Sequence, residues 1–133
     1  MSLAAKSQKG LLRDPKVLPA ETMIEMATIR GAKAVGQEDQ IGSLEIGKKA
    51  DFIAIKVQNL HQLPVYDPVS SIVHATNARD VNHVVVDGKV LLRDGCLVTL
   101  DEGEVIREAV KAGKNVLDRS GIASQVHSSW PAE

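Results

Sequence analysis

Apolar and small residues recur at helical spacing early in the chain. Between residues 20 and 35 they repeat at intervals of three and four: Ile24, Ala27, Gly31 and Ala34. Such a period places them on one face of an α-helix. Pro19 suits the first helical position because its missing N–H would have no partner there, and Gly36 suits the position after the last turn. The pattern predicts a helix over 20–35.

The middle of the chain changes to short apolar runs separated by turn residues. Three consecutive ranges are expected to form a strand, a turn and a strand: 43–46, 47–50 and 51–57. The second strand is almost continuously apolar, which is typical of a strand covered on both faces. Farther on, Asp87-Gly88 lies between runs rich in valine and leucine, which predicts a hairpin over 80–92 with a type I′ turn. After a further turn, 96–100 is expected to be a short strand or an extended tail.

The remaining segments are assigned from the glycine, proline and capping residues that begin or end them. A helical pattern near the start is expected to end at Gly10, and 58–71, with two prolines, is expected to be an extended loop. Residues 71–75 fit a short helix or a strand equally well. Asp101, with glutamate three positions later, has the spacing of a capping box. It predicts a helix that runs to about Arg119, followed by a polar tail.

Composition narrows the class of protein. The chain has 133 residues, the length of one domain, with 44% apolar residues and only one each of Phe, Tyr and Trp. Sixteen basic and seventeen acidic side chains leave a net charge of −1, which argues against a nucleic-acid-binding surface. Apolar runs are shorter than the roughly 20 residues that span a membrane, and a signal peptide is not evident. A cytoplasmic location is the default expectation.

Candidate chemistry is sparse. The four histidines are His61, His74, His83 and His127, and none lies two or four positions from another, so the usual metal-binding spacings are missing. His74 and His83 flank Asp80, which leaves a metal or acid–base grouping conceivable, although a half-buried His74 and an exposed His83 are the commoner outcome. Cys96 is expected to be a small, semi-buried structural side chain.

Three further groups have simple structural interpretations. Ser70-Ser71 lies near Asp67 and His74, but a Ser-His-Asp triad is defined by geometry and not by such proximity in sequence. Lys48-Lys49 is expected to be a solvated turn. Asp51, at the start of a strand, is expected to accept turn N–H groups and not to bind a metal. From the residues alone, we predict no catalytic, cofactor-binding or metal-binding residue in this chain.

A resemblance to a known family runs through four blocks. Residues 42–55 read GSLEIGKKADFIAI, which resembles the segment G-S-[IL]-x-x-G-K-x-A-D-[FL]-[VI] near the C-terminus of amidohydrolase-superfamily enzymes. The preceding MATIRGAKAVG of residues 26–36 is similar to a helix of the same enzymes. Residues 63–75 and 80–91 resemble the next two blocks in order. Within the superfamily, the sequence is most similar to the cytosine deaminase, chlorohydrolase and S-adenosylhomocysteine deaminase branch.

The resemblance implies an α+β fold: a small β-sandwich-like sheet flanked by the last helix of a (β/α)8 barrel and by a C-terminal helix. It implies five segments: a truncated barrel-derived lead-in (1–18), the last barrel helix (19–36), the C-terminal part of the sandwich (37–100), the C-terminal helix (101–120) and a flexible tail (121–133). In this family the metal, zinc or another divalent ion, is held by barrel residues. Those residues would precede residue 1, so the metal-bearing barrel is expected to be absent.

Two main hypotheses of different kinds follow. In the first, the chain is the C-terminal fragment of a metal-dependent amidohydrolase and scaffolds a barrel without performing chemistry. In the second, it is a stand-alone β-sandwich module that acts by binding or oligomerisation. A small enzyme that uses His74 and His83 is a third possibility. We also expect self-association through open sheet edges and helix 20–35, and no nucleic-acid or membrane partner.

Overall fold

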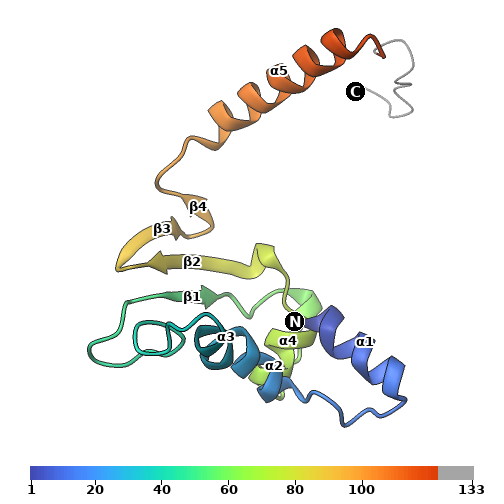
Figure 1. Ribbon diagram of the computed structural model, residues 1–133, viewed down its shortest axis with the longest axis vertical. Coiled ribbons are helices and arrows are strands. Elements are labelled where there is room, and N and C mark those ends of the chain that lie inside the picture. Colours follow the sequence, from blue (N-terminus) through green and yellow to red (C-terminus); the bar gives the residue numbers. More distant parts are fainter. Residues whose placement is uncertain (123–133) are drawn as a thin grey trace. The chain divides into compact units, whose positions relative to one another are not determined.

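The computed structural model describes residues 1–122 and consists of two units, Met1–Val98 and a second that begins at Thr99. The first unit contains four α-helices, two short 3-10 helices and four strands (Figure 1): α1 (Ser2–Leu12), α2 (Ala20–Ala27), α3 (Ile29–Ala34), β1 (Phe52–Ile55), η1 (Leu60–Gln62), α4 (Pro68–His74), η2 (Ala78–Asp80), β2 (Val81–Val86), β3 (Lys89–Arg93) and β4 (Cys96–Leu97). The second unit contains α5 (Glu102–Ser120). The predicted α+β class is confirmed.

The helix predicted over 20–35 is in fact two helices. α2 and α3 are separated by Thr28, whose backbone has φ −125° and ψ −98°. The Thr28 hydroxyl donates to the Ile24 carbonyl at 2.7 Å, a contact of the kind that bends helices. Pro19 precedes the first turn as its cap and is not the first helical residue. Gly36 follows α3 with φ +67°, as expected of a residue after a helix end.

The strand expected at 43–46 is wrong, because this segment folds as a turn-rich loop. The Lys48 N–H donates to the Glu45 carbonyl within the loop and not to a partner strand. Gly42 begins the loop with φ +94° and packs against α3. A Cβ at this position would lie 2.7 Å from the Ala32 Cβ, so glycine is required both by the backbone angle and by the close approach.

The sheet is antiparallel, and its strands lie side by side in chain order (Figure 1). The predicted hairpin is confirmed: Asp87 and Gly88, with φ 51° and 73°, form the tight turn between β2 and β3. Asp94 and Gly95, with φ 52° and 77°, form a second turn of the same kind before β4. Positive φ at both central residues is the requirement of a type I′ turn. Residues 96–100 therefore begin as a two-residue strand.

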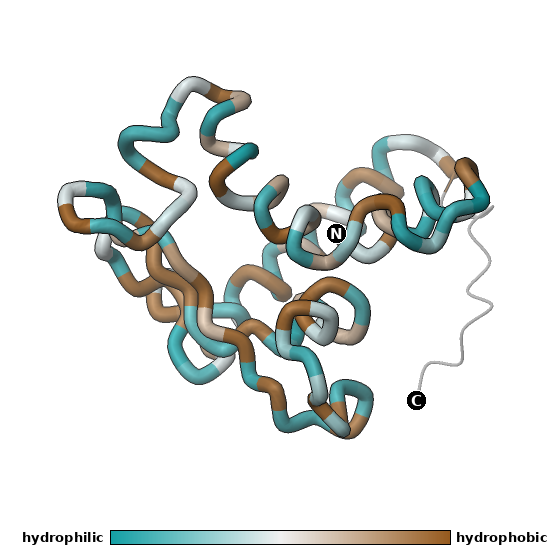
Figure 2. Tube along the Cα trace, turned by 90° about the horizontal axis from the view of Figure 1, so that it is seen from below, coloured by the Kyte–Doolittle hydropathy of each residue, from teal (hydrophilic) through white to brown (hydrophobic). Residues whose placement is uncertain are grey.

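The expectation that 51–57 is covered on both faces is wrong for its first residues. β1 is the terminal strand of the sheet, and Phe52 and Ile53 are 42% and 55% exposed. Hydrophobic residues dominate β1, β2 and β3, as the brown segments of the trace in Figure 2 show. The apolar run is thus typical of a strand whose side chains are buried on both faces. In the described chain, Phe52 and Ile53 are covered only in part.

Two stretches are more helical than their sequence suggested. α1 continues through Gly10 and ends in a left-handed residue at Arg13. α4 occupies the end of the segment expected to be a loop over 58–71 and decides residues 71–75 in favour of a helix up to His74. Its start is stabilised by Asp67, whose carboxylate accepts the Val69 N–H at 3.0 Å.

A small helical core lies on the β1 side of the sheet. Met23 of α2 and Val73 of α4 are buried together with Ala5 of α1, and Leu18, Ala20 and Ile24 pack around them partly buried. Among the described residues, the buried apolar side chains are these three and Ala32. Four such residues form a small core for a unit of this length, and much apolar surface remains exposed.

α5 confirms the predicted C-terminal helix. The Asp101 carboxylate accepts the Glu104 N–H at 2.9 Å, and Gly121 ends the helix with φ +69°. Four of its apolar side chains are exposed: Val105, Ile106, Val110 and Val116. The tail predicted over 121–133 lies, beyond Ile122, outside the described residues. Among the helices of residues 1–122, none has the length and apolar character needed to cross a membrane.

Candidate functional site

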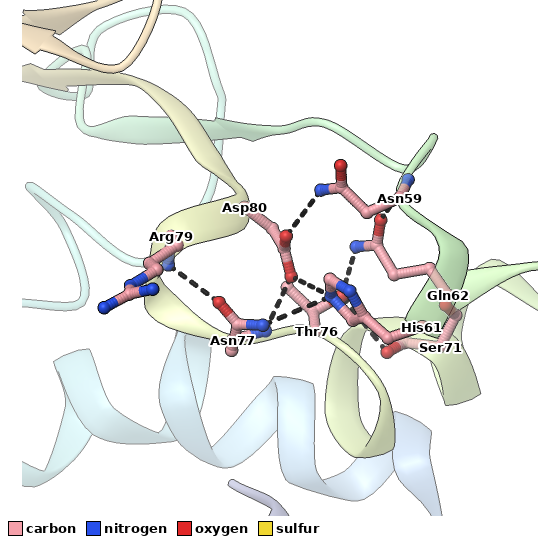
Figure 3. Close-up of polar contacts among 8 residues, drawn as sticks. All are labelled: Asn59, His61, Gln62, Ser71, Thr76, Asn77, Arg79 and Asp80. Carbon is pink, nitrogen blue, oxygen red and sulfur yellow. Dashed lines mark hydrogen bonds and ion pairs between the residues drawn. The ribbon is translucent and has the colours of Figure 1, made fainter.

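The most highly connected polar group in the described chain is the carboxylate of Asp80, at the end of η2. Asp80 is 3% exposed and accepts three hydrogen bonds (Figure 3). The Asn77 N–H donates to Oδ2 at 2.8 Å, the Asn59 amide donates to Oδ1 at 2.7 Å, and His61 Nε2 lies 2.8 Å from Oδ2. A buried carboxylate requires such partners, and here donors surround both of its oxygens.

These contacts favour the ionised form of Asp80. The Asn77 N–H, then the His61 imidazole, hold the pKa of Asp80 below its ordinary value, although burial acts in the opposite direction. An ionised carboxylate only accepts, so His61 Nε2 must carry the proton in this contact. The Asn77 side-chain nitrogen, 3.2 Å from the same Nε2, therefore approaches a donor and cannot hydrogen-bond to it at the same time.

The local sequence explains how this cluster forms. Asn59 is the cap residue of η1 and Asn77 that of η2, and the Asn77 side chain accepts the Arg79 N–H at 2.9 Å. The third residue of each turn bonds back to the cap: Gln62 Oε1 accepts the Asn59 N–H at 3.2 Å, and Asp80 accepts that of Asn77. Two reciprocal caps of the capping-box type thus meet, and Asn59 joins them by donating to Asp80.

The cluster extends from the sheet to α4. Gln62, which is 4% exposed, donates to the Thr76 hydroxyl at 3.2 Å, and that hydroxyl donates to the Ser71 carbonyl at 3.2 Å. On the other side, the Asp80 carbonyl accepts the Lys56 N–H just after β1, at 2.8 Å. One polar network therefore connects the end of β1, both 3-10 helices, the end of α4 and the start of β2.

The cluster contains a histidine oriented by an aspartate, as in an acid–base pair. The described residues around it supply neither a nucleophile bonded to that histidine nor a metal site. His61 is half exposed, and its hydrogen bond through Nε2 to a buried aspartate fixes the tautomer and the orientation of the ring. Residues 1–122 contain no group of three or more side chains suited to holding a metal. His61 and Asp80 are only two potential metal ligands, and both Asp80 oxygens already accept hydrogen bonds from Asn59 and Asn77. These residues do not fit a zinc site, and the arrangement is that of a structural cross-link.

The residues that sequence reasoning had singled out lie apart. Asp80 pairs with His61, not with His74 or His83; His83 Nε2 instead lies 3.7 Å from the carboxylate of Asp94. The grouping of His74 and His83 about Asp80, which the sequence left only conceivable, is therefore not formed. His74 is half-buried as expected, whereas His83 is half-buried and not exposed. Cys96 is exposed in the two-residue strand β4, so the expectation that it would be semi-buried is wrong. His127 lies outside the described residues.

The Ser-His-Asp combination shares a surface but forms no hydrogen-bonded chain in the described structure. Ser70, Ser71 and His74 line a shallow depression with Asp67, which uses its carboxylate to cap α4. The Ser71 hydroxyl is buried without a hydrogen-bond partner among the described residues. A triad needs a nucleophile bonded to an oriented base, and that relationship is missing from these four residues.

Lys48 does not behave as the sequence predicted, whereas Asp51 does. Lys48 is not a solvated lysine, because its side chain is 19% exposed and its ammonium contacts Ser43 at 2.8 Å and Glu45 at 3.4 Å. The pKa of Glu45 is lowered by Ser43, the larger cause, and by Lys48. Asp51 accepts the N–H of Asp87 at 2.6 Å, so it stabilises the tip of the hairpin as a turn acceptor.

Comparison with known proteins places this fold. The profile of the amidohydrolase family matches residues 1–91, more than half of the chain. The chain belongs to the amidohydrolase family. The resemblance carried by residues 26–91 is thus confirmed, and the polar cluster about Asp80 belongs to an amidohydrolase-family segment.

Individual relatives agree with this membership. The 5-methylthioadenosine/S-adenosylhomocysteine deaminase of Desulforudis audaxviator is 39% identical over 118 residues, which cover 89% of this chain and 27% of that protein. The 5'-deoxyadenosine deaminase of Methanosarcina mazei is 40% identical over 119 residues, or 90% of this chain and 27% of that protein. The chain spans about a quarter of the length of these curated relatives.

Solved structures share the fold. An adenosine deaminase from Xanthomonas campestris with bound zinc superposes with a TM-score of 0.80 at 30% identity, over 85% of this chain and 26% of that one. An atrazine chlorohydrolase from Arthrobacter aurescens, complexed with zinc, matches with a TM-score of 0.64 at 26% identity, over 71% of this chain and 20% of that one. Both zinc-bound enzymes are much longer than the segment they share with this chain.

Proposed function

We propose that this chain is the C-terminal scaffold segment of a metal-dependent amidohydrolase that removes an amino group from a ring, as a deaminase does. Two observations together support this proposal best. The chain matches about a quarter of each of several deaminases, and its own best-connected polar cluster is a cross-link that does not fit a metal. The chemistry would then belong to barrel residues outside this segment, and the metal would be zinc or another divalent ion.

The exposed apolar surface of the first unit supports a scaffold role. Leu3 and Leu11 on α1 are 79% and 75% exposed, and Ile29 on α3 is 55% exposed. Large exposed apolar side chains on neighbouring helices are typical of a surface that packs against further protein. In the proposal, α1, α2 and α3 contact the barrel, and the sheet forms part of a β-sandwich.

A complementation experiment tests the proposal. The chain alone is expected to bind zinc substoichiometrically, measured by elemental analysis, and to leave 5'-methylthioadenosine and adenosine unchanged. It is then co-expressed with the Methanosarcina mazei deaminase from which the matching segment has been deleted. Restored deamination in the mixture supports the proposal. Turnover by the chain alone, or a folded mixture without activity, contradicts it.

The second candidate is a stand-alone module that acts by binding or oligomerisation. It is favoured by one observation, the closed hydrogen-bond network about Asp80, which holds the first unit together from its own residues. The same experiment separates the two: a module of this kind is well folded alone and fails to complement the deleted deaminase. We also propose a cytoplasmic location, which fractionation of the native host would test.

A further inference from the structure

We propose that the stretch of polypeptide immediately before residue 1 of the full-length enzyme fills an apolar cavity lined by α2, α4 and the sheet. This rests on the scaffold role proposed above, in which barrel residues precede residue 1. It goes beyond that role because it assigns one contact between the two parts of the protein: the residues of the first unit that make it and the segment that they receive.

The cavity lies within the first unit and has a volume of about 510 Å³. Ile24 and Ala27 of α2 and Ile72 of α4 line it, together with residues of β1 and β2. Protein interiors are close-packed and contain few voids larger than a water molecule. A space of this size among the helices and strands of one unit therefore predicts that further protein packs there.

The sheet residues at the cavity are only partly covered. Ile53 pairs with Val84 across β1 and β2, so these two side chains share one face of the sheet, and alternation along β1 adds Ile55. Ile53 is 55% exposed, and Val86, which also lines the cavity, is 44% exposed. A sheet normally buries its apolar face against a second layer. Here α2 and α4 supply only part of that layer.

The polar side chains at the cavity do not suit a small-molecule ligand. The Asp51 carboxylate accepts the Asp87 N–H at 2.6 Å, and the Thr28 hydroxyl donates to the Ile24 carbonyl at 2.7 Å. Both are thus engaged within the fold, whereas ligand pockets of this size present a few polar groups directed at the ligand. The apolar side chains of a protein segment fit such a lining better.

The position of Met1 indicates which segment this is. Met1 lines the cavity and is 48% exposed, so residues joined to it begin beside the cavity. The match covers 27% of the Methanosarcina mazei deaminase, which leaves most of such a protein outside it. A tethered segment has a roughly millimolar effective concentration at any protein concentration, which favours it over a second copy of the chain.

A chimera, in which this chain replaces the matching segment of the Methanosarcina mazei deaminase, tests the proposal. Ala27→Cys is introduced into the chain alone and into the chimera, with Cys96→Ser to remove the natural thiol. Labelling of position 27 by N-ethylmaleimide, followed by peptide mass spectrometry, is expected to be about tenfold slower in the chimera, because the thiol reacts only when the covering segment opens. Lys89→Cys is the control: Lys89 is exposed on β3 outside the cavity lining and should react equally fast in both.

A second chimera tests which segment covers the cavity. About ten residues before the junction are replaced by glycine and serine, which keep the chain connected but supply no apolar side chain. Labelling at position 27 is then expected to return to the rate of the chain alone, while circular dichroism checks that the chimera remains folded. Unchanged protection would assign the cavity to another part of the barrel and overturn the proposal.

The outcomes separate this contact from the scaffold role. An active chimera in which position 27 reacts as fast as in the chain alone overturns the proposed contact and leaves the scaffold role intact. A folded chimera without deamination contradicts the scaffold role, and the rate at position 27 then still decides whether the cavity is filled. Protection in the chain alone that increases with its concentration would assign the cavity to a second copy and overturn the proposed contact.

Discussion

The imidazole of His61 lies 2.8 Å from the carboxylate of Asp80, although the two residues are 19 positions apart along the chain. One partner is half exposed and the other is buried. The pair connects the turn after β1 with the turn before β2, and Asn59 and Asn77 complete the shell about the carboxylate. The His61–Asp80 pair joins two turns of the chain, so we expect its removal to lower the free energy of unfolding.

Removing the imidazole should destabilise the fold. His61→Ala is expected to lower the free energy of unfolding by about 1.5 kcal/mol, because it deletes a hydrogen bond to a buried charged group. His83→Ala is the matched control: its ring lies 3.7 Å from the largely exposed Asp94, and such pairs contribute about 0–1 kcal/mol. Urea unfolding followed by circular dichroism measures both. Equal effects would mean that the His61–Asp80 contact has no special role.

Acid should weaken the same contact from the aspartate side. The pKa of Asp80 lies below its ordinary value of 3.8 in the folded chain. Its contribution is therefore complete above the unfolded value and is lost as pH falls through the lower, folded value. Asp80→Asn is expected to reduce the loss of stability between about pH 5 and pH 3. Glu45, whose pKa is also lowered, remains in both proteins and cancels in the comparison.

Asp80→Asn should also be less stable than the unmodified chain at pH 7. An amide has one acceptor oxygen and two N–H donors, whereas the site supplies donors from Asn77, Asn59 and His61. Unfolding of the two proteins across the pH range tests both statements together. Parallel curves of stability against pH would show that Asp80 does not titrate as its contacts require.

Two glycines of the same loop should respond differently to substitution. Gly42→Ala places a methyl group 2.7 Å from the Ala32 Cβ and 3.1 Å from the Thr28 carbonyl, with φ at +94°. Gly47→Ala has nearly the same angle, +95°, but meets nothing within 4 Å. We expect a loss of about 1 kcal/mol at Gly47, from the left-handed backbone alone, and about 2–4 kcal/mol at Gly42.

Thermal unfolding of the two variants measures that difference. If Gly42→Ala costs no more than Gly47→Ala, the loop does not pack against α3 as described. A larger loss at Gly42 would show that the two positions share a backbone angle, whereas the close approach to α3 is specific to one of them.

The cap of α5 can be tested in its own unit. Asp101→Ala removes the acceptor for the Glu104 N–H and is expected to cost about 1 kcal/mol of helix stability. Asp118→Ala, near the other end of the same helix, removes a carboxylate that caps nothing in the described residues and should cost less. Helical content by circular dichroism compares the two. A greater loss with Asp118→Ala would contradict the capping role of Asp101.

Much of the local structure could be predicted because neighbours along the chain decide it. Asp87-Gly88 forms its turn since both residues accept positive φ, and Asp101 begins α5 since its carboxylate reaches an N–H three residues away. The same locality explains the errors. Residues 43–46 have the alternation of a strand, but no strand lies beside them in the described chain, and the loop bonds to itself instead.

In the cluster about Asp80, local contacts could also be predicted from the sequence, whereas long-range contacts could not. The amino-acid sequence by itself determined the two caps, Asn59 with Gln62 and Asn77 with Asp80, since each spans three residues, and it determined membership of the amidohydrolase family. It could not determine that His61 would meet Asp80 and that His74 would not, because nothing local relates these positions. Only the tertiary structure decided that, by pairing β1 with β2 and so bringing the turns at their ends together.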